Sequence, residues 1–579
     1  MSHREPAGWL LRHIPALDAL RTYSWAAFGR DLTAGLTVAT VAVPQAMAYA
    51  TLAGLPPQYG LFTAIVMTAA GALFDSSRQL INGPTNALSI ALLSALAVVP
   101  EGQRIQAAIA LAFLVGMIQL GIALARLGDL TRFVSHSVIV GFTLGAAVLL
   151  VLDQTKHLLG QEARGEPNDH FLKRFWLALS TGGAVHWPTI GIGAGTIVVV
   201  VAIRQLNAAL RAQRFRFPVP QHLVAVVLMA LLVWLGRLDE QGVKVVGAVP
   251  PELPAFQPPE LKWDQLQLQM GNALALALLG LLEAVAMAKA IAARAGQRLD
   301  VNQQCLSEGV ANLTGSFFQC FPGSGSLTRS AINQQAGAVS QWSGVFAAVT
   351  VAAVVLLFAP LARFIPRAAL AALLLLAAYR MVDGRQLWFH LRATRFDAGV
   401  VAATALAAVL ISIEFCIVIG VFLSFALYVP RAARVKLSEL TPFPDGGLRE
   451  RLRGDPPGGR LLAYDLEGEM FFGAGAELAK HLATVDEAAR GAVRTVILSL
   501  RRARNPDAVF LSALRVFCAG LHARGVTLLL CGVRSDLLNA LAATGLTATI
   551  GEEHIFAEDQ PDNSSECSAV RFAQNLLGR

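Results

Sequence analysis

The chain contains 579 residues, of which 55% are hydrophobic and 15% are charged, and its mean hydropathy is +0.54. These values exclude a disordered chain, a collagen-like repeat and a small disulfide-stapled fold, and they indicate an integral membrane protein that hides its apolar surface in lipid. The formal net charge of +8 raises nucleic-acid binding as an alternative, which depends on where the basic residues lie.

Apolar blocks follow one another from residue 31 to residue 430, separated by short polar connections. A helix needs about 20 apolar residues to cross the hydrocarbon core of a bilayer. The blocks predict fourteen crossings, at residues 33–52, 59–74, 84–99, 105–126, 137–152, 186–203, 219–236, 271–290, 306–318, 327–340, 343–361, 367–380, 397–413 and 414–430. We expect Pro44 to break the first of them. The preceding segment, 1–30, lacks the compact apolar core of a cleaved signal peptide.

The basic residues predict the orientation of the chain. With a cytoplasmic start and fourteen crossings, the cytoplasmic side receives five Arg-bearing connections, at residues 75–82, 126–132, 204–216, 294–300 and 380–395. The opposite side receives 237–269, where both signs of charge mix, and 161–185, an exception with three basic residues. This asymmetry predicts a multi-pass protein of a bacterial-type plasma (inner) membrane with both termini cytoplasmic. The positive charge therefore reflects topology, and no nucleic-acid partner is expected.

The composition changes after residue 430. Residues 431–460 are rich in Arg, Pro and Gly and predict a linker. Residues 461–556 alternate apolar strands with helices, which predicts a small α/β domain with a mainly parallel sheet, and residues 557–579 are expected to form a C-terminal tail. Because an even number of crossings returns the chain to its starting side, we expect this domain in the cytoplasm.

Proline, glycine and one carboxylate recur at matching places in the two halves of the apolar region. Pro44 and Pro84 in the first half are spaced like Glu283 and Pro322 in the second. The pattern predicts an inverted repeat of seven plus seven helices, with half-length helices after `GPT` and `PGSGS`. Two facing helix starts would direct unpaired N–H groups and positive dipole ends at one point, which predicts an anion site.

Several polar residues stand out against the apolar blocks. A carboxylate at a block centre costs about 2.5–3.5 kcal/mol on insertion scales, so a functional role for Glu283 is favoured over a structural pairing. Arg329 follows two hydroxyl residues near a helix start, which favours an anion contact over an interfacial charge. Gln45 and Tyr49 lie one helical turn apart on one face. For this pair, binding and polar packing between helices both stay open.

Motifs for enzyme chemistry are missing from the sequence. The six cysteines form no CxxC pair and no metal-ligand spacing with histidine, which predicts reduced, packed thiols. The `GSGS` segment lacks the lysine of a phosphate-binding loop. We find no nucleophile–base set and no cofactor fingerprint, so we expect neither an enzyme nor a bound metal or cofactor.

These motifs resemble the SulP family, the sulfate-permease type of anion transporter, over nearly the whole chain. `PQAMAYATLAGLPPQYGLF`, `GPTNALS`, `GLLEAVAMAKAIA` and `GSGSLTRSAIN` are similar to that family's first two, third, eighth and tenth helices. The C-terminal module is similar to a STAS domain. The resemblance implies a core domain (helices 1–4 and 8–11), a gate domain (helices 5–7 and 12–14), a homodimer and elevator-like movement of the site.

The resemblance also assigns roles to individual residues. It implies proton coupling by Glu283 and substrate binding by Gln45, Thr85, Ser326, Leu327, Thr328 and Arg329, and Tyr49 joins this set through its spacing from Gln45. STAS modules that act as phosphorylation switches carry Asp-x-Ser-Gly before a helix. This chain reads Asp507–Ala508–Val509–Phe510, so the acceptor serine is missing and a scaffold or dimerisation role is favoured.

The leading hypothesis is a secondary active transporter that imports a small oxyanion, sulfate first, together with protons. Glu283 would be ionised in the empty site, where it neutralises Arg329, and protonated when a divalent anion arrives. Because `EAVAMAKA` supplies no hydroxyl beside Glu283, sodium coupling is disfavoured. Sodium-coupled bicarbonate uptake, dicarboxylate uptake and chloride exchange fit the same frame. A nucleobase permease shares the architecture, but its site should favour hydrogen-bonding carboxylates over an Arg at the tenth-helix start. A non-transporting membrane sensor that signals through the STAS domain is the alternative from a different class.

Overall fold

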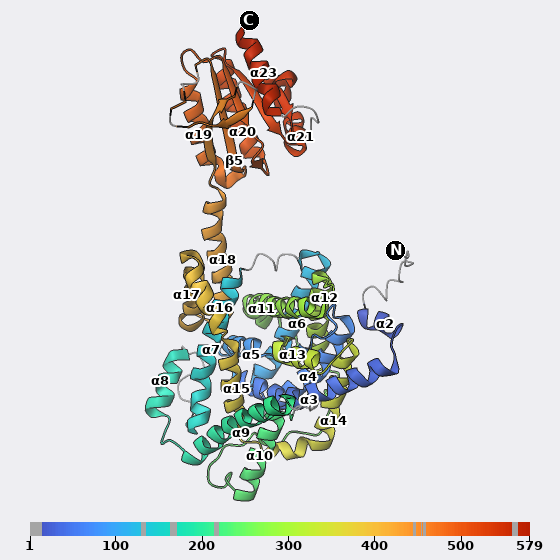
Figure 1. The fold of residues 1–579 in the computed structure, drawn as a ribbon. Helices are drawn as coiled ribbons and strands as arrows, with labels where there is room; N and C mark the ends of the chain where they lie inside the picture. Colours follow the sequence, from blue (N-terminus) through green and yellow to red (C-terminus); the bar gives the residue numbers. More distant parts are fainter. Residues whose placement is uncertain are drawn as a thin grey trace. The chain divides into compact units, whose positions relative to one another are not determined.

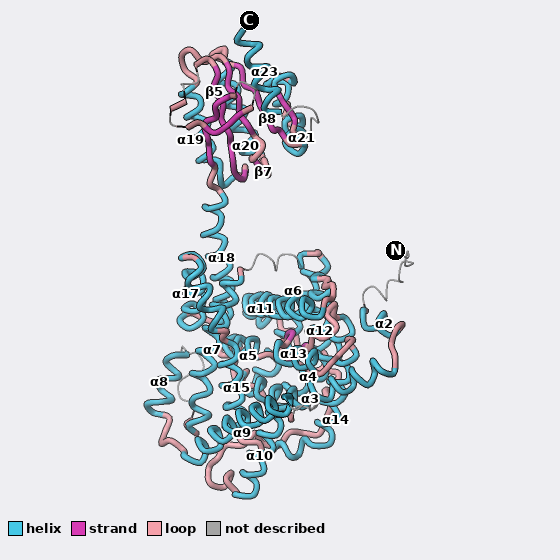
Figure 2. The backbone as a smooth tube through the Cα atoms, viewed as in Figure 1, coloured by secondary structure: helices cyan, strands magenta, loops and turns pink. Residues whose placement is uncertain are grey.

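The structure is a computed structural model that describes residues 14–128, 135–162, 171–212, 219–443, 447–452, 454–455, 459–558 and 565–578. Parts of the expected N-terminal segment, linker and tail, and of the connections 126–132, 161–185 and 204–216, lie outside the described residues. The chain divides into two compact units, Met1–Ser424 and Phe425–Arg579. In the described part of the first unit, the regular elements are helices apart from two very short strands, whereas the second unit contains a sheet (Figure 2).

Each of the fourteen predicted blocks is a helix within the described part of the chain (Figure 1). These helices are α3 (Trp25–Leu52), α4 (Pro57–Phe74), α5 (Asn86–Ala95), α6 (Arg104–Leu124), α7 (His136–Leu159), α9 (Trp187–Ala212), α10 (Gln221–Gly236), α11 (Trp263–Ala295), α12 (Val301–Ser316), α13 (Leu327–Gln335), α14 (Trp342–Phe358), α15 (Arg367–Met381), α17 (Arg395–Leu410) and α18 (Ile413–Ala432). Among the described residues, eight helices are long and apolar enough to cross a membrane.

Within the described residues of the first unit, three more α-helices lie outside this set, namely α2 (Pro15–Leu20), α8 (Phe171–Thr181) and α16 (Gly384–Ala393). The seven-helix series therefore occurs twice, with α3–α7, α9 and α10 in the first half of the unit and α11–α15, α17 and α18 in the second.

The expected break at Pro44 is wrong, because α3 is one helix from Trp25 to Leu52 and Pro44 lies inside it. Proline has no N–H, so the carbonyl of Thr40 loses its helical partner. The helix continues nevertheless, since α3 packs along α4, α13 and α14 and Pro44 itself is buried. Tertiary packing outweighs the local cost of the proline.

The helices of the first unit contact one another in two groups. One group consists of α3–α6 and α11–α14, in which α12 packs on α4 and α6, and α14 on α3 and α4. The other consists of α7, α9, α10, α15 and α17, in which α7 packs on α15 and α17. These groups are the core and gate domains that the resemblance implies, and we use those names for them below. α3 contacts α10 and α15, and α5 contacts α7, so the two groups meet beside α3 and α5.

The second unit contains a seven-stranded sheet that runs β4-β3-β5-β6-β8-β9, with β7 paired to β5. The strands are β3 (Lys436–Pro442), β4 (Leu448–Glu450), β5 (Leu461–Glu469), β6 (Thr495–Ser499), β7 (Ala503–Arg504), β8 (Thr527–Val533) and β9 (Ile555–Ala557). Strands β5, β6, β8 and β9 are parallel, as the alternating pattern predicts.

Helices cover both faces of this sheet. α19 (Gly475–Ala488), α20 (Ala508–His522), α21 (Ser535–Ala543) and α22 (Leu546–Ile550) share a buried core with Val496 and Leu498 of β6. Ile497 points to the other face. There it packs with Ala569 and Val570 of α23 (Ser565–Gly578), so the segment expected to be a tail contributes a helix to this domain.

The segment expected to be a linker contributes strands β3 and β4. Its Arg, Pro and Gly content obscured the apolar residues of β3, of which Leu437 and Leu440 pack against the two cores of the domain. The described part of 431–460 therefore belongs largely to the folded domain.

Candidate functional site

Helix α5 begins inside the first unit, directly after a two-residue strand. Strand β1 (Asn82–Gly83) is followed by Pro84, and Thr85 is the N-cap of the helix. The Thr85 hydroxyl oxygen accepts a hydrogen bond from the N–H of Leu88 at 3.4 Å. Helix α5 then runs for ten residues only, as the prediction of a half-length helix requires.

Helix α13 begins in the same way in the second half of the repeat. Strand β2 (Ser324–Gly325) precedes Ser326, whose hydroxyl oxygen accepts a hydrogen bond from the N–H of Arg329 at 3.5 Å. The helix is nine residues long. Both predicted half-length helices are therefore present.

The two helix starts are held together by their own backbone. Strands β1 and β2 pair antiparallel, with Asn82 opposite Gly325 and Gly83 opposite Ser324. The N–H of Ser326 also donates to the carbonyl of Ile81 at 2.9 Å. Each start leaves N–H groups without helical partners and carries the positive end of its dipole. The pairing thus brings two electropositive helix ends to one place.

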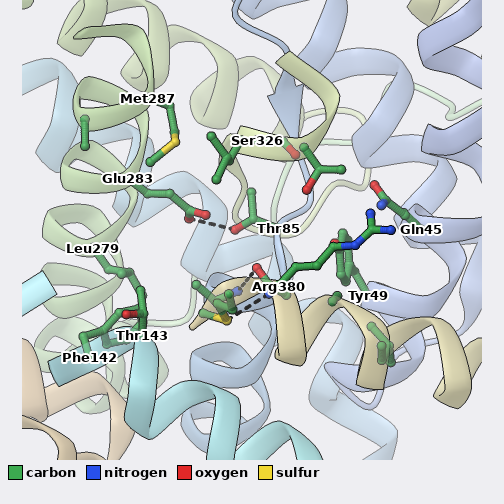
Figure 3. A pocket seen from close by; sticks show the side chains of 18 of the residues that line it. Gln45, Tyr49, Thr85, Phe142, Thr143, Leu279, Glu283, Met287, Ser326 and Arg380 are labelled. Atoms are coloured by element: carbon green, nitrogen blue, oxygen red, sulfur yellow. Dashed lines mark hydrogen bonds between the residues drawn. The ribbon is translucent and has the colours of Figure 1, made fainter. Parts of the chain in front are cut away.

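A cavity of about 320 Å³ lies in front of these starts. Seven of the eight predicted site residues line it, namely Gln45, Tyr49, Thr85, Glu283, Ser326, Leu327 and Thr328. Apolar side chains of α7, α11 and α15 complete the wall, among them Phe142, Leu279 and Leu373 (Figure 3). The cavity therefore lies between the core and gate helices, and its size is typical of a small-ligand site.

Glu283 enters the cavity from α11 and faces the start of α5. The Thr85 hydroxyl donates a hydrogen bond to Glu283 Oε2 at 3.0 Å (Figure 3). The expectation that no hydroxyl lies beside Glu283 is therefore wrong. It considered neighbours along α11 alone, whereas the hydroxyl comes from a residue almost two hundred positions earlier in the chain.

Arg329 is the predicted site residue that does not line the cavity. Its side chain is 1% exposed and lies behind the two helix starts, where Nη2 donates to the carbonyl oxygen of Pro84 at 2.8 Å. No salt bridge among the described residues joins it to Glu283, and the two opposite charges interact over a longer distance. Arg329 places a buried positive charge behind the wall of the cavity and ties α13 to the entry of α5.

Gln45 and Tyr49 lie opposite Glu283 and point into the cavity from α3 (Figure 3). Both are buried, and among the described residues Gln45 Oε1 has no hydrogen-bond partner. A buried acceptor without a partner is costly, so it indicates a position that a donor such as water satisfies.

The sequence interpretation missed Arg380 as a lining residue and counted it among the cytoplasmic charges. It lies in the last turn of α15, on the same face as Leu373 and Ala377, which also line the cavity. In Figure 3 its side chain extends toward Gln45 and Tyr49. Because Leu373, Ala377 and Arg380 are spaced to lie on one helical face, their spacing was the sequence signal that could have identified Arg380 as a lining residue.

A second, larger cavity of about 1360 Å³ adjoins the first. The two share four lining residues, namely His222, Leu327, Thr328 and Arg380. Arg30 of α3 and Arg204 of α9 also line the larger cavity, and none of its described lining residues is acidic. An anion is therefore favoured in this chamber as well.

In the C-terminal domain, Asp507 is the N-cap of α20. Its Oδ1 accepts hydrogen bonds from the N–H groups of Val509 at 2.9 Å and Phe510 at 3.0 Å. Val509 stands where a phosphorylation switch carries its serine, and its exposed side chain has no hydroxyl. Asp507 thus has a structural role in starting the helix.

Comparisons with known proteins agree with this architecture. The model of the sulfate permease family matches residues 28–404, and that of the STAS domain matches residues 457–559. Sulfate transporter 4.1 of Arabidopsis thaliana chloroplasts is 29% identical over 566 residues, which cover 95% of this chain and 82% of the relative. A probable sulfate transporter of Mycobacterium tuberculosis is 31% identical over 556 residues, which cover 95% of this chain and 96% of the relative.

Two solved structures share the fold. The murine Solute Carrier 26 family member A9 anion transporter, in its inward-facing state, has a TM-score of 0.89 at 20% identity, and the match covers 99% of this chain and 96% of that one. The transmembrane domain of the cyanobacterial bicarbonate transporter BicA has a TM-score of 0.58 at 23% identity, with 69% of this chain and 98% of that one covered.

Proposed function

The chain belongs to the sulfate permease family, and from that premise we propose that it carries sulfate across a membrane by coupling uptake to protons. It is a multi-pass membrane protein and a transporter of small anions rather than an enzyme. The curated relatives described above are named sulfate transporters, which favours sulfate among the possible anions.

The observation that carries the proposal is the convergence of two helix starts on one buried cavity. Their caps, Thr85 and Ser326, are uncharged, so no cap side chain neutralises the positive dipole ends. Backbone N–H groups and hydroxyls would bind the anion there, and Arg329 would stabilise it from behind the helix starts. Gln45 and Tyr49 would contact it from α3.

Glu283 would supply the proton coupling. Beside an empty site, the ionised carboxylate is stabilised by the Thr85 hydroxyl and by the two helix ends. An anion that enters competes for the same groups and repels the carboxylate. Glu283 then takes up a proton, so one proton enters with the substrate.

Movement of the core group against the gate group would carry the site from one side of the membrane to the other. The cavity lies between these groups, and β1 and β2 tie both helix starts to the core. A rigid core would therefore carry the complete set of N–H donors with it, as an elevator mechanism requires. We place the protein in a bacterial inner membrane as a homodimer, with both termini in the cytoplasm.

Reconstitution of the purified protein in liposomes tests this function. Labelled sulfate should accumulate under an inward proton gradient, and unlabelled sulfate should compete better than bicarbonate, succinate or chloride. Glu283→Gln should abolish accumulation above equilibrium, whereas Glu260→Gln, an exposed residue between α10 and α11, should leave it unchanged. Proton-driven accumulation by Glu283→Gln would contradict the coupling role, and absence of flux of every anion would contradict transport.

Sodium-coupled bicarbonate uptake is the second candidate, and one observation favours it. The hydroxyl of Thr85 and the carboxylate of Glu283 place two oxygen ligands together, which suits a hard cation. The same liposomes under a sodium gradient at equal pH distinguish the two. Sodium-driven bicarbonate accumulation would replace the proton-coupled assignment.

A further inference from the structure

Arg380 is placed differently from the other cations of the first unit. It lines both the small cavity and the larger chamber. It belongs to gate helix α15, whereas the helix starts and Glu283 belong to the core. An anion that moves between the two cavities therefore passes the Arg380 guanidinium. Arg380 would then contact, from the gate group, an anion that is bound to the core group.

The Arg380 guanidinium is also available for a ligand. No ion pair or hydrogen bond within the described residues involves it, and its side chain is exposed to the cavities. Figure 3 shows it directed toward Gln45, which is 8% exposed and whose side-chain Nε2 carries N–H donors. A planar guanidinium beside a buried amide is a donor set that suits a tetrahedral oxyanion.

The charges around the small cavity favour a bound anion of a particular charge. Among its described lining residues Glu283 is the one carboxylate and Arg380 the one guanidinium, while Arg329 lies buried behind the wall. With Glu283 protonated, these two positive charges remain at the small cavity, and Arg204 of the larger chamber adds positive potential at Arg380. A divalent anion neutralises both, whereas a monovalent anion leaves one positive charge uncompensated in a partly buried site.

We propose that Arg380 sets the preference of this site for divalent over monovalent anions. The inference rests on the proposed function and adds the substrate class that the site selects. A unit charge interacts twice as strongly with a divalent as with a monovalent anion. When this charge is lost, the factor by which divalent binding weakens is therefore the square of the factor for monovalent binding. A weakening of about threefold for a monovalent anion corresponds to about tenfold for a divalent one.

Sulfate and perchlorate test this proposal because both are tetrahedral oxyanions and they differ in charge. Equilibrium binding of each to the purified full-length protein is measured for the wild type and for Arg380→Gln. We expect about tenfold weaker sulfate binding and at most about threefold weaker perchlorate binding in the variant. Arg380→Lys should keep the wild-type ratio. Arg385→Gln, on the exposed helix α16 outside both cavities, is the matched control and should change neither affinity.

The outcomes separate this inference from the function it rests on. The valence role alone is overturned if Arg380→Gln leaves the ratio of the sulfate to the perchlorate affinity unchanged. It is also overturned if Arg380→Lys behaves like Arg380→Gln. A wild-type protein that binds neither anion overturns the proposed function. Arg380→Met keeps the apolar stem of the side chain, and it replaces Arg380→Gln where that variant is not monodisperse, with the same expected ratio.

Discussion

The starts of α5 and α13 and the start of α20 share one local geometry but differ in what surrounds them. In each, a side-chain oxygen of the N-cap accepts a backbone N–H bond. Asp507 places a full negative charge on the dipole of α20, and its Oδ1 satisfies two N–H groups. Thr85 and Ser326 are neutral, and both line a cavity.

The difference shows that a helix start alone does not make an anion site. Three further conditions are met at the starts of α5 and α13, namely an uncharged cap, a second start held against the first, and a cavity between helix groups, whereas α20 begins at a charged cap. The β1–β2 pair supplies the second condition, because it holds two starts together that are far apart in the chain. The comparison suggests changes that would remove one condition at a time.

The largest effect is expected from Thr85→Asp, which gives α5 the charged cap of α20. The new carboxylate would face both Glu283 and the anion. At an intermediate effective dielectric constant, a like charge at 4 Å costs about 4 kcal/mol against a monovalent anion and about 8 kcal/mol against sulfate, so the affinity should fall by more than about a thousandfold. Uptake of labelled sulfate in liposomes should therefore fall below detection. Thr85→Ser keeps the neutral hydroxyl and should retain uptake, and a working Thr85→Asp transporter would refute the argument.

A smaller effect is expected when the contact between the two starts is disturbed. Gly83 in β1 has φ +139°, and a Cβ at this position would lie 2.8 Å from Nη1 of Arg329. Gly83→Ala should lower the free energy of unfolding by about 1–3 kcal/mol through backbone strain. Any displacement of Arg329 would add to this loss. We expect a lower melting temperature and roughly tenfold slower uptake. Gly121→Ala is the control, because nothing lies within 4 Å of its added Cβ. Equal behaviour of the two variants would show that this contact is dispensable.

The smallest effect is expected at the start of α20. Asp507→Ala removes two cap hydrogen bonds and should destabilise the start of α20 by about 1 kcal/mol, whereas Asp507→Asn keeps an acceptor. Amide hydrogen exchange of the first turn in the full-length protein should become about fivefold faster in the alanine variant, and sulfate uptake should stay unchanged. A loss of transport with intact folding would instead indicate a regulatory role for this helix start.

Much of the fold was predictable because apolar blocks, arginine connections and strand patterns are local signals. The two half-length helices were predictable too, since Pro and Gly mark their starts. The errors came from contacts between distant residues. Pro44 stays helical because α3 is packed along its length, and the Thr85 hydroxyl reaches Glu283 from another helix. Arg380 was missed because a charge at the end of an apolar block has the same local pattern whether it faces water or a site.

Electron cryo-microscopy of the protein with bound selenate, an electron-dense divalent analogue of sulfate, tests the central claim most directly. The account predicts density for the anion within hydrogen-bond distance of both helix starts, beside Thr85 on α5 and Leu327 and Thr328 on α13. Density confined to the larger chamber, or an empty cavity in a protein that transports selenate under the same conditions, would contradict it.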